Sequence, residues 1–388
     1  MSNQAIFLFN FAKNNRMKKL FLFLSVLGVF IACSSDSDSN TVGSGDNYDR
    51  TAMLTNWADN LIIPRYVDYQ SKVEALNTAA NDFATTPDQV NLESLRTAWE
   101  QAYKAYQYVG MFGIGKAEEI NFVSCTNIYP TNVAGIETNI TSGTYDFSLL
   151  SQYDKQGFPA LDYMINGLAT TDSTILAFYT TNANATNYKQ YLTDLTARLK
   201  INIDAIITDW NGNYRIAFIA SNGNSVSSSV NKLVNAFVKY YERDVRAGKV
   251  GIPAGIYSNG TLYPEKVEAY YKNTFSKELL NEAIQSAQDF FNGKHFSSTA
   301  EGPSLKSYLD YLNTVRNGQN LSAIINTQFA TIYTTNAVLS NSFSEQVNTD
   351  NNAMIASFDA LQQNVVYFKL DMMQALNITV DYVDADGD

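Results

Sequence analysis

The sequence predicts an all-α protein made of two helical bundles of about four helices each. Apolar residues recur at helical spacing over long stretches, and no comparable stretch alternates with the period of a strand. The chain has 388 residues but only seven prolines, so these patterns run largely unbroken. Roughly 355 residues remain after the N-terminal leader described below, which is enough for two domains that each bury a core.

The expected helices follow one another along both halves of the chain. The first covers residues 49–82, with a bend expected at Pro64. A polar run at residues 221–225 divides the helices into two sets, which places the first bundle at 49–221 and the second at 222–388. The other expected helices lie within residues 92–106, 188–210, 226–246, 276–292, 304–340 with interruptions, and 346–377.

Residues 1–32 have the pattern of a lipoprotein signal peptide, whose true start can be Met17. Lys18 and Lys19 precede thirteen uncharged residues, a run too short to cross a bilayer as a helix. The segment ends in a small residue before Cys33, which resembles a bacterial lipobox and makes Cys33 the expected lipidation site. The alternative is an ordinary secretory signal cleaved near Ala32.

Residues 33–48 form an expected flexible acidic tether, because serine, aspartate, asparagine and glycine offer no apolar surface to bury. Their acidic start resembles the export tags of bacterial surface lipoproteins. We therefore expect an outer-membrane lipoprotein that can be exposed at the cell surface. Its lipid anchor makes the membrane a partner.

The net charge limits the classes of partner, and the cysteine content limits the disulfides that can form. The net charge is −11 for the whole chain and falls to about −15 without residues 1–32, which hold four basic and no acidic side chains. An acidic protein is a poor partner for nucleic acid and a better one for cations. Without Cys33 only Cys125 remains, so no intramolecular disulfide is expected, and Cys125 is interpreted as a small core residue.

Several familiar sites are excluded by counting. The single histidine, His295, rules out a zinc site of the HExxH kind. Residues 110–116 nearly spell a phosphate-binding loop, but Ala117 replaces the serine or threonine that would hold magnesium. The aspartate-rich residues 384–388 lack the closing glutamate of a calcium loop.

Five segments occur in the order found in imelysin-like proteins, and together they extend over nearly the whole mature chain. They are Trp-Glu-Gln-Ala-Tyr at 99–103, Tyr-Pro at 129–130, Gly-Phe-Pro-Ala-Leu-Asp at 157–162, Arg-Asp-Val-Arg-Ala-Gly-Lys at 243–249, and the aspartate-rich 384–388. The chain thus resembles a divergent member of that family, which includes proteins named as insulin-cleaving membrane proteases and iron-regulated lipoproteins.

This resemblance implies two helical bundles, a link to iron uptake, and a metal site at a GxHxxE motif. Gly157 matches the motif glycine, but Pro159 stands in place of the histidine and Asp162 in place of the glutamate. The histidine ligand therefore cannot be carried over. In the second half, Arg243, Asp244 and Lys249 match a further family motif.

Two interpretations of residues 157–162 stay open. Proline suits the first position of a helix and Gly157 can supply an unusual turn before it, so the segment can be a helix start alone. Alternatively, Asp162 belongs to an oxygen-only metal site, since carboxylates bind hard cations, ferric iron included, without histidine. The candidate carboxylates for that site are Glu118, Glu119, Glu137, Glu242, Asp244, Glu265 and Glu268, of which Glu137, Asp244 and Glu268 are assigned with Asp162.

Three functions follow from these features. The first is a non-catalytic binding protein in iron acquisition, which takes iron, an iron complex or an iron-bearing partner in a cleft between the bundles. This function predicts a concave acidic or aromatic pocket near Asp162. The second is a helical envelope protein-interaction module without a metal site, which predicts an exposed apolar patch. The third is a metallopeptidase, which needs a metal-activated water and a general base and is disfavoured by Pro159.

Overall fold

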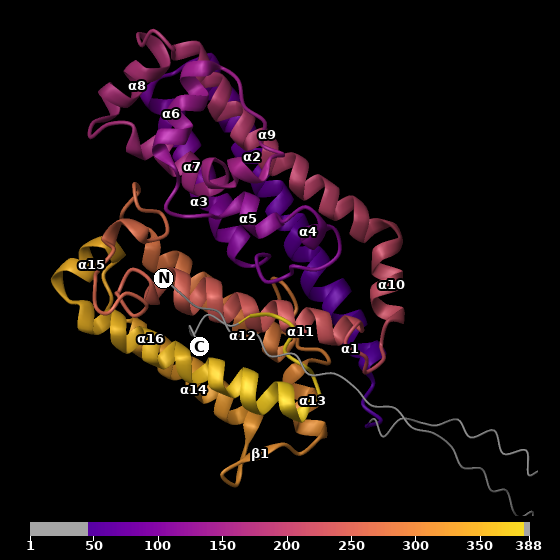
Figure 1. Ribbon diagram of the computed structural model, residues 1–388. Helices are drawn as coiled ribbons and strands as arrows, with labels where there is room; N and C mark the ends of the chain where they lie inside the picture. The colour runs from indigo at the N-terminus through magenta and orange to yellow at the C-terminus, as the bar shows by residue number, and fades with distance from the viewer. Residues whose placement is uncertain (1–45, 384–388) are drawn as a thin grey trace, which may run out of the picture. The chain divides into compact units, whose positions relative to one another are not determined.

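The structure, a computed structural model, describes residues 46–383, and these residues fold almost entirely into helices (Figure 1). The predicted all-α class is confirmed. The signal peptide, Cys33, nearly all of the tether and the aspartate-rich 384–388 lie outside the described residues. Within 46–383, no helix is both long enough and apolar enough to span a membrane.

The first half begins with one continuous helical run. It consists of α1 (Arg50–Asn56), the π-helical turn η1 (Trp57–Ile62) and α2 (Ile63–Thr85). Pro64 lies in the first turn of α2, directly after the π turn, so its missing N–H falls where the regular hydrogen-bond ladder is already interrupted.

The core of this half forms where α3 (Gln89–Gln107) and α9 (Ala185–Asp209) pack along α2. Shorter elements connect these long helices: α4 (Lys116–Glu119), α5 (Phe122–Thr126), α6 (Val133–Ser142), η2 (Leu150–Lys155), α7 (Gly157–Asp162), η3 (Tyr163–Gly167), α8 (Asp172–Thr180), η4 (Trp210–Tyr214) and α10 (Arg215–Ala220).

In the second half, α11 (Ser229–Lys239) continues into an unusually long π-helical segment, η5 (Tyr240–Gly251). The π segment packs on α16 (Asn351–Val366), which also lies along α14 (Leu321–Asn336). The remaining elements are η6 (Pro264–Lys266), α12 (Ser276–Asn292), α13 (Leu305–Tyr311), β1 (Val315–Arg316), β2 (Gln319–Asn320), α15 (Phe343–Thr349), η7 (Tyr367–Met372) and α17 (Met373–Ala375).

The interruption expected within residues 304–340 is a small antiparallel hairpin of β1 and β2. Its turn residues, Asn317 and Gly318, have φ values of 50° and 77°. An Asn-Gly pair with both residues at positive φ is the preferred two-residue hairpin turn, so the local sequence explains why the helix breaks here.

Aromatic contacts continue the core from one half of the chain to the other. The rings of Trp57 and Phe290 lie 5.1 Å apart, and those of Trp99 and Phe275 lie 5.7 Å apart. The polar run at residues 221–225 lies in a largely exposed loop between α10 and α11. The division into two bundles at this loop stays a prediction.

Candidate ligand-binding cleft

The motif segment 157–162 forms a short helix, but this helix begins at Gly157, so Pro159 is its third residue and not the first as expected. Gly157 is the first residue of α7 and has a φ of +78°, a backbone conformation that glycine adopts without strain. A Cβ atom at this position would lie 2.1 Å from the carbonyl oxygen of Thr126. Both the turn and the close approach to α5 therefore require glycine.

The carboxylate of Asp162 is buried, with 1% of the residue exposed, and it joins α7 to a loop of the second half. Its oxygens accept hydrogen bonds from the backbone N–H groups of Tyr271 and Lys272, at 2.9 Å each, and from the side-chain amide of Asn166, also at 2.9 Å. Burial raises the pKa of Asp162 to about 6, against the lowering effect of these hydrogen bonds and of Lys272.

Glu137 lies in a different environment on α6. Its two carboxylate oxygens accept hydrogen bonds from the hydroxyl groups of Tyr163 and Tyr188, at 2.6 Å each. Tyr163 follows Asp162 directly in the chain, but both oxygens of Glu137 are directed to tyrosines rather than to Asp162. Glu137 thus ties α6 to η3 and α9.

Glu268 forms a buried ion pair with Lys249 of η5. The same carboxylate accepts hydrogen bonds from Asn127 at 2.8 Å and from Gln107 at 3.3 Å. Burial lowers the pKa of Lys249, while the charge of Glu268 raises it. Because Gln107 and Asn127 belong to the first half and Lys249 to the second, this network is a polar bridge between them.

The structure does not bring the four predicted metal-ligating carboxylates together. In residues 46–383, no group of three or more histidine, cysteine, aspartate or glutamate side chains is arranged to hold a metal ion. Asp244 and Glu268 both lie near Lys249, whereas Asp162 and Glu137 have the separate partners described above. An assignment of all four to one site has no geometric support in this part of the chain.

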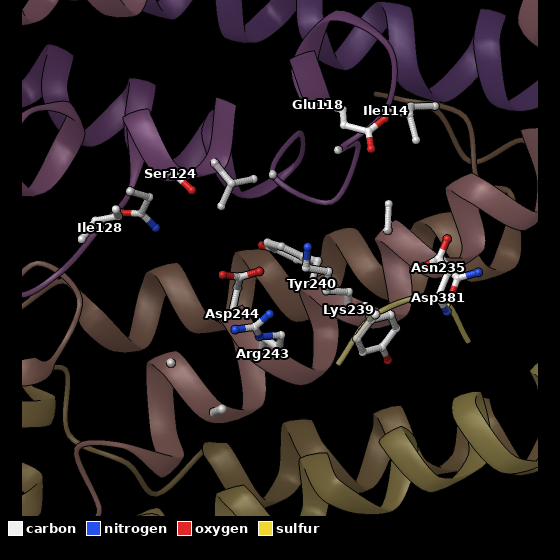
Figure 2. Close-up of a pocket in the computed structure, with 18 of the residues that line it drawn as sticks. Ile114, Glu118, Ser124, Ile128, Asn235, Lys239, Tyr240, Arg243, Asp244 and Asp381 are labelled. Atoms are coloured by element: carbon white, nitrogen blue, oxygen red, sulfur yellow. Dashed lines mark hydrogen bonds between the residues drawn. The ribbon is translucent and has the colours of Figure 1, made fainter. Parts of the chain in front are cut away.

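A cavity of about 880 Å³ lies between the α4–α5 region and the face of α11 and η5 (Figure 2). One wall includes Ser124 and Ile128, and the other includes Lys239, Tyr240 and Asp244. A volume of this size is in the range of pockets that hold small molecules. The cavity is therefore our candidate ligand-binding cleft.

A segment close to the C-terminus closes one side of this cleft. Asn235 on α11 donates a hydrogen bond to the carbonyl oxygen of Thr379 at 2.9 Å and accepts one from the backbone N–H of Asp381 at 3.1 Å. The hydroxyl of Tyr382 donates to the buried carboxylate of Glu242 at 2.8 Å. Asp381 and Tyr382 thereby become part of the cleft lining.

Three cations from α11 and η5 line the cleft without a fixed partner. Lys232, Lys239 and Arg243 are exposed, and none forms an ion pair or side-chain hydrogen bond with any residue in the 46–383 range. Lys266, over the ring of Tyr263 at 3.7 Å, adds a fourth basic group. In a chain with a net charge of −11, four basic side chains in one cleft are a local concentration of positive charge.

Asp244 lies among these cations and points into the cleft in Figure 2. Burial raises its pKa to about 6, although Lys249, Arg243 and Lys239 lower it. Its carboxylate accepts no hydrogen bond from the described residues, so both oxygens are available to a ligand. Ser124 presents a hydroxyl from the opposite wall.

A second, smaller cavity of about 140 Å³ lies beside the motif segment. Pro159 and Asp162 contribute to its wall together with Tyr270 and Tyr271, and it shares Tyr129 with the larger cleft. The aromatic pocket expected near Asp162 is thus present, but Pro159 gives it a ring without a donor atom where the family motif has histidine.

Sequence reasoning named Arg243 as a motif residue but missed Lys232, Lys239 and Lys266. Lys232 and Lys239 are seven residues apart on one helix, so they lie on the same face, and Leu233 and Phe237 occupy the buried face. This pattern could have indicated a row of exposed basic side chains along the helix. It could not indicate that α5, more than a hundred residues earlier, lies across from it.

Comparisons with known proteins place these features in context. The family model described as imelysin, peptidase M75, matches residues 62–368. Iron-regulated protein A of Synechococcus elongatus is 21% identical over 295 residues, which cover 72% of this chain and 74% of that protein. Two solved structures share the fold, at 16–18% identity, and each comparison covers 86% of this chain and 97% of the other. They are an imelysin-like protein from Psychrobacter arcticum, with a TM-score of 0.67, and a putative iron-regulated protein A precursor from Parabacteroides distasonis, with a TM-score of 0.68.

Proposed function

Because the chain belongs to the imelysin family, we propose that it is a non-catalytic binding protein of iron acquisition, which holds an iron complex in the cleft between α5 and η5. Iron is here the cargo rather than a resident cofactor. The observation that carries the proposal is the cleft itself, where unpaired cations surround a carboxylate that has no partner among the described residues. Similarity to a protein named for iron regulation also supports a role in iron acquisition.

The lining of the cleft suits chelated iron better than a bare ion. A bare ferric ion is best held by several oxygen ligands at once, and Asp244 is surrounded by Lys239, Arg243 and Lys249. A ferric chelate carries its own oxygen ligands and often a negative charge, which those cations can neutralise. Asp244 can then contact the complex as one additional oxygen donor.

The proposal is tested by iron retention. The mature protein, incubated with ferric citrate and passed through a desalting column, is expected to elute with iron measured by mass spectrometry. An Arg243→Gln variant is expected to retain less iron, whereas Lys306→Gln, at a partly exposed position outside the cleft, serves as the matched control. Equal retention by all three proteins, or none by any, would refute the proposal.

We do not extend the proposal to peptide hydrolysis. Pro159 offers no ligand atom at the histidine position, and both oxygens of Asp162 accept backbone hydrogen bonds. A metal-activated water at this position would have neither of the ligands that the family motif provides. The protein-interaction module remains the alternative outcome if no iron is retained.

The proposed location is the outer membrane, through lipidation of Cys33. The support is the sequence pattern of residues 1–33 and the acidic tether after it. In cells, the wild-type protein is expected in the membrane fraction and Cys33→Ser in the soluble envelope fraction. Identical fractionation of the two proteins would refute the anchor without affecting the cleft.

A further inference from the structure

We propose that the cleft contains a subsite for a hydroxy-polycarboxylate anion, in which Lys239 and Arg243 hold carboxylates and Asp244 accepts a hydrogen bond from the hydroxyl. This inference rests on the proposed function in one respect, since it names the chemical class of the ligand that would carry the iron. It concerns the organic ligand itself, so it can be tested without iron.

The spacing of the cations fits a small polyanion. Lys239 is the last residue of α11, and Arg243 follows four residues later in η5, a little less than one π-helical turn away. Two carboxylates of one small molecule can reach both groups, because lysine and arginine side chains are long and these two have no competing partner in residues 46–383. Lys232, about 10 Å further along the helix, leaves room for a larger ligand.

Asp244 makes the subsite selective. A carboxylate beside the cations would repel a ligand that presents only charged oxygens, so a simple anion site gains nothing from it. A ligand with a hydroxyl can donate a hydrogen bond to Asp244 while its own carboxylates bind Lys239 and Arg243. A site built to accept from a hydroxyl discriminates against the analogue that lacks it, because the acceptor is then left unpaired.

The surroundings of the subsite favour recognition of anions despite the acidic chain. The basic groups among the cleft-lining residues are Lys232, Lys239, Arg243 and Lys266, and the acidic ones are Glu118, Asp244 and Asp381. Low-dielectric walls concentrate the field of such groups, so the four basic side chains can attract an anion into the cleft although the chain as a whole is acidic. Ser124 on the facing wall can add a hydrogen bond to a bound carboxylate.

The test is titration calorimetry of the full-length mature protein with citrate, in iron-free buffer at low ionic strength. Citrate is expected to bind, and tricarballylate, which lacks only the hydroxyl, is expected to bind about tenfold more weakly or worse. The Lys239→Gln/Arg243→Gln variant is expected to lose citrate affinity by about tenfold or more, whereas Lys306→Gln keeps it.

A third variant isolates the selective group. Asp244→Asn is expected to reduce the preference for citrate over tricarballylate, mainly because tricarballylate is no longer repelled. Circular dichroism melting curves establish that each variant is folded. Absence of citrate binding, or equal affinity in wild type and the double variant, would overturn the subsite; equal affinity for citrate and tricarballylate would overturn the role of Asp244. Citrate binding without iron retention would instead refute the iron function alone.

Discussion

Lys249 and Glu268 form an ion pair in which only 3% and 1% of the side chains are exposed. Lys249 comes from η5 and Glu268 from the segment before α12, and the hydrogen bonds of Asn127 and Gln107 attach the first half of the chain to this pair. Two charges removed from water in this way depend strongly on one another.

Loss of one partner of this pair should destabilise the protein strongly. Lys249→Met leaves the carboxylate of Glu268 buried and unpaired, with an expected loss of about 3–5 kcal/mol in the free energy of unfolding. The Lys249→Met/Glu268→Gln double variant should lose less than Lys249→Met alone, because no unpaired charge remains. Urea denaturation of the three proteins measures both effects.

A surface ion pair provides the matched control. Lys306 and Glu301 are 3.2 Å apart with 37% and 47% of their side chains exposed, so Lys306→Met should cost about 1 kcal/mol or less. Equal losses for Lys306→Met and Lys249→Met would mean that burial of the Lys249–Glu268 pair has no energetic consequence.

The buried Asp162 predicts a pH dependence of stability. Its pKa rises from 3.8 to about 6 on folding, so the folded state binds the proton more tightly than the unfolded state. The stabilising contribution is complete below pH 3.8 and is lost as the pH rises through 6. A shift of this size corresponds to about 2–3 kcal/mol.

Asp162→Asn isolates this effect, because asparagine does not titrate. Unfolding free energies of both proteins at several pH values between 4 and 7 give the difference between wild type and variant. Relative to the variant, wild type should become more stable by about 2–3 kcal/mol as the pH falls from 7 to 4. The pKa of Asp244 is also raised to about 6, but Asp244 is present in both proteins, so its contribution cancels from the difference in unfolding free energy. A difference that stays constant with pH would contradict the prediction.

Gly157 should not tolerate alanine. The +78° φ and the 2.1 Å approach of a Cβ atom to the carbonyl oxygen of Thr126 together predict a loss of at least about 2 kcal/mol in the free energy of unfolding. Gly223 is the matched control, because a Cβ atom there meets nothing within 4 Å. Gly223→Ala should change stability by no more than about 0.5 kcal/mol. A similar loss at both positions would show that the backbone turn and the Thr126 contact do not require glycine at position 157.

Cys125 should be chemically inert in the folded protein. It is fully buried, burial raises the pKa of its thiol, and Asn202 donates a hydrogen bond to its sulfur at 3.3 Å. In a Cys33→Ser protein, a thiol reagent such as DTNB should react orders of magnitude more slowly without denaturant than in concentrated urea. Rapid reaction of the folded protein would show that the α5 region opens readily.

The helices could be predicted from the sequence because their signal is local. Residues 276–292 match α12 at both ends, since the apolar periodicity lies within the segment and the closing Gly293 directly follows it. The change from α to π geometry within residues 226–246 was not predicted. The π-helical segment η5 packs on α16. Whether a helix has α or π hydrogen bonds depends on such tertiary contacts, and the spacing of apolar residues alone does not reveal it.

The site could be predicted only in part for a related reason. Asp244 was named as a candidate and does line the cleft, and a helix does start in the motif segment, two residues before the expected Pro159. The partners of Asp162 are backbone N–H groups of Tyr271 and Lys272, which carry no side-chain signature. Contacts made by the backbone of a distant loop depend on tertiary folding and cannot be read from residue types.

The hydrogen bonds that join Asn235 to Thr379 and Asp381 also set an order of events. Asn235 leaves the ribosome more than 140 residues before Asp381, so α11 can form long before its neighbour in the cleft exists. Until residues 379–382 lie on α11, this side of the cleft has no wall. The contacts of Asn235 therefore fix the final width of the cleft, and they can form only after the rest of its lining has been synthesised.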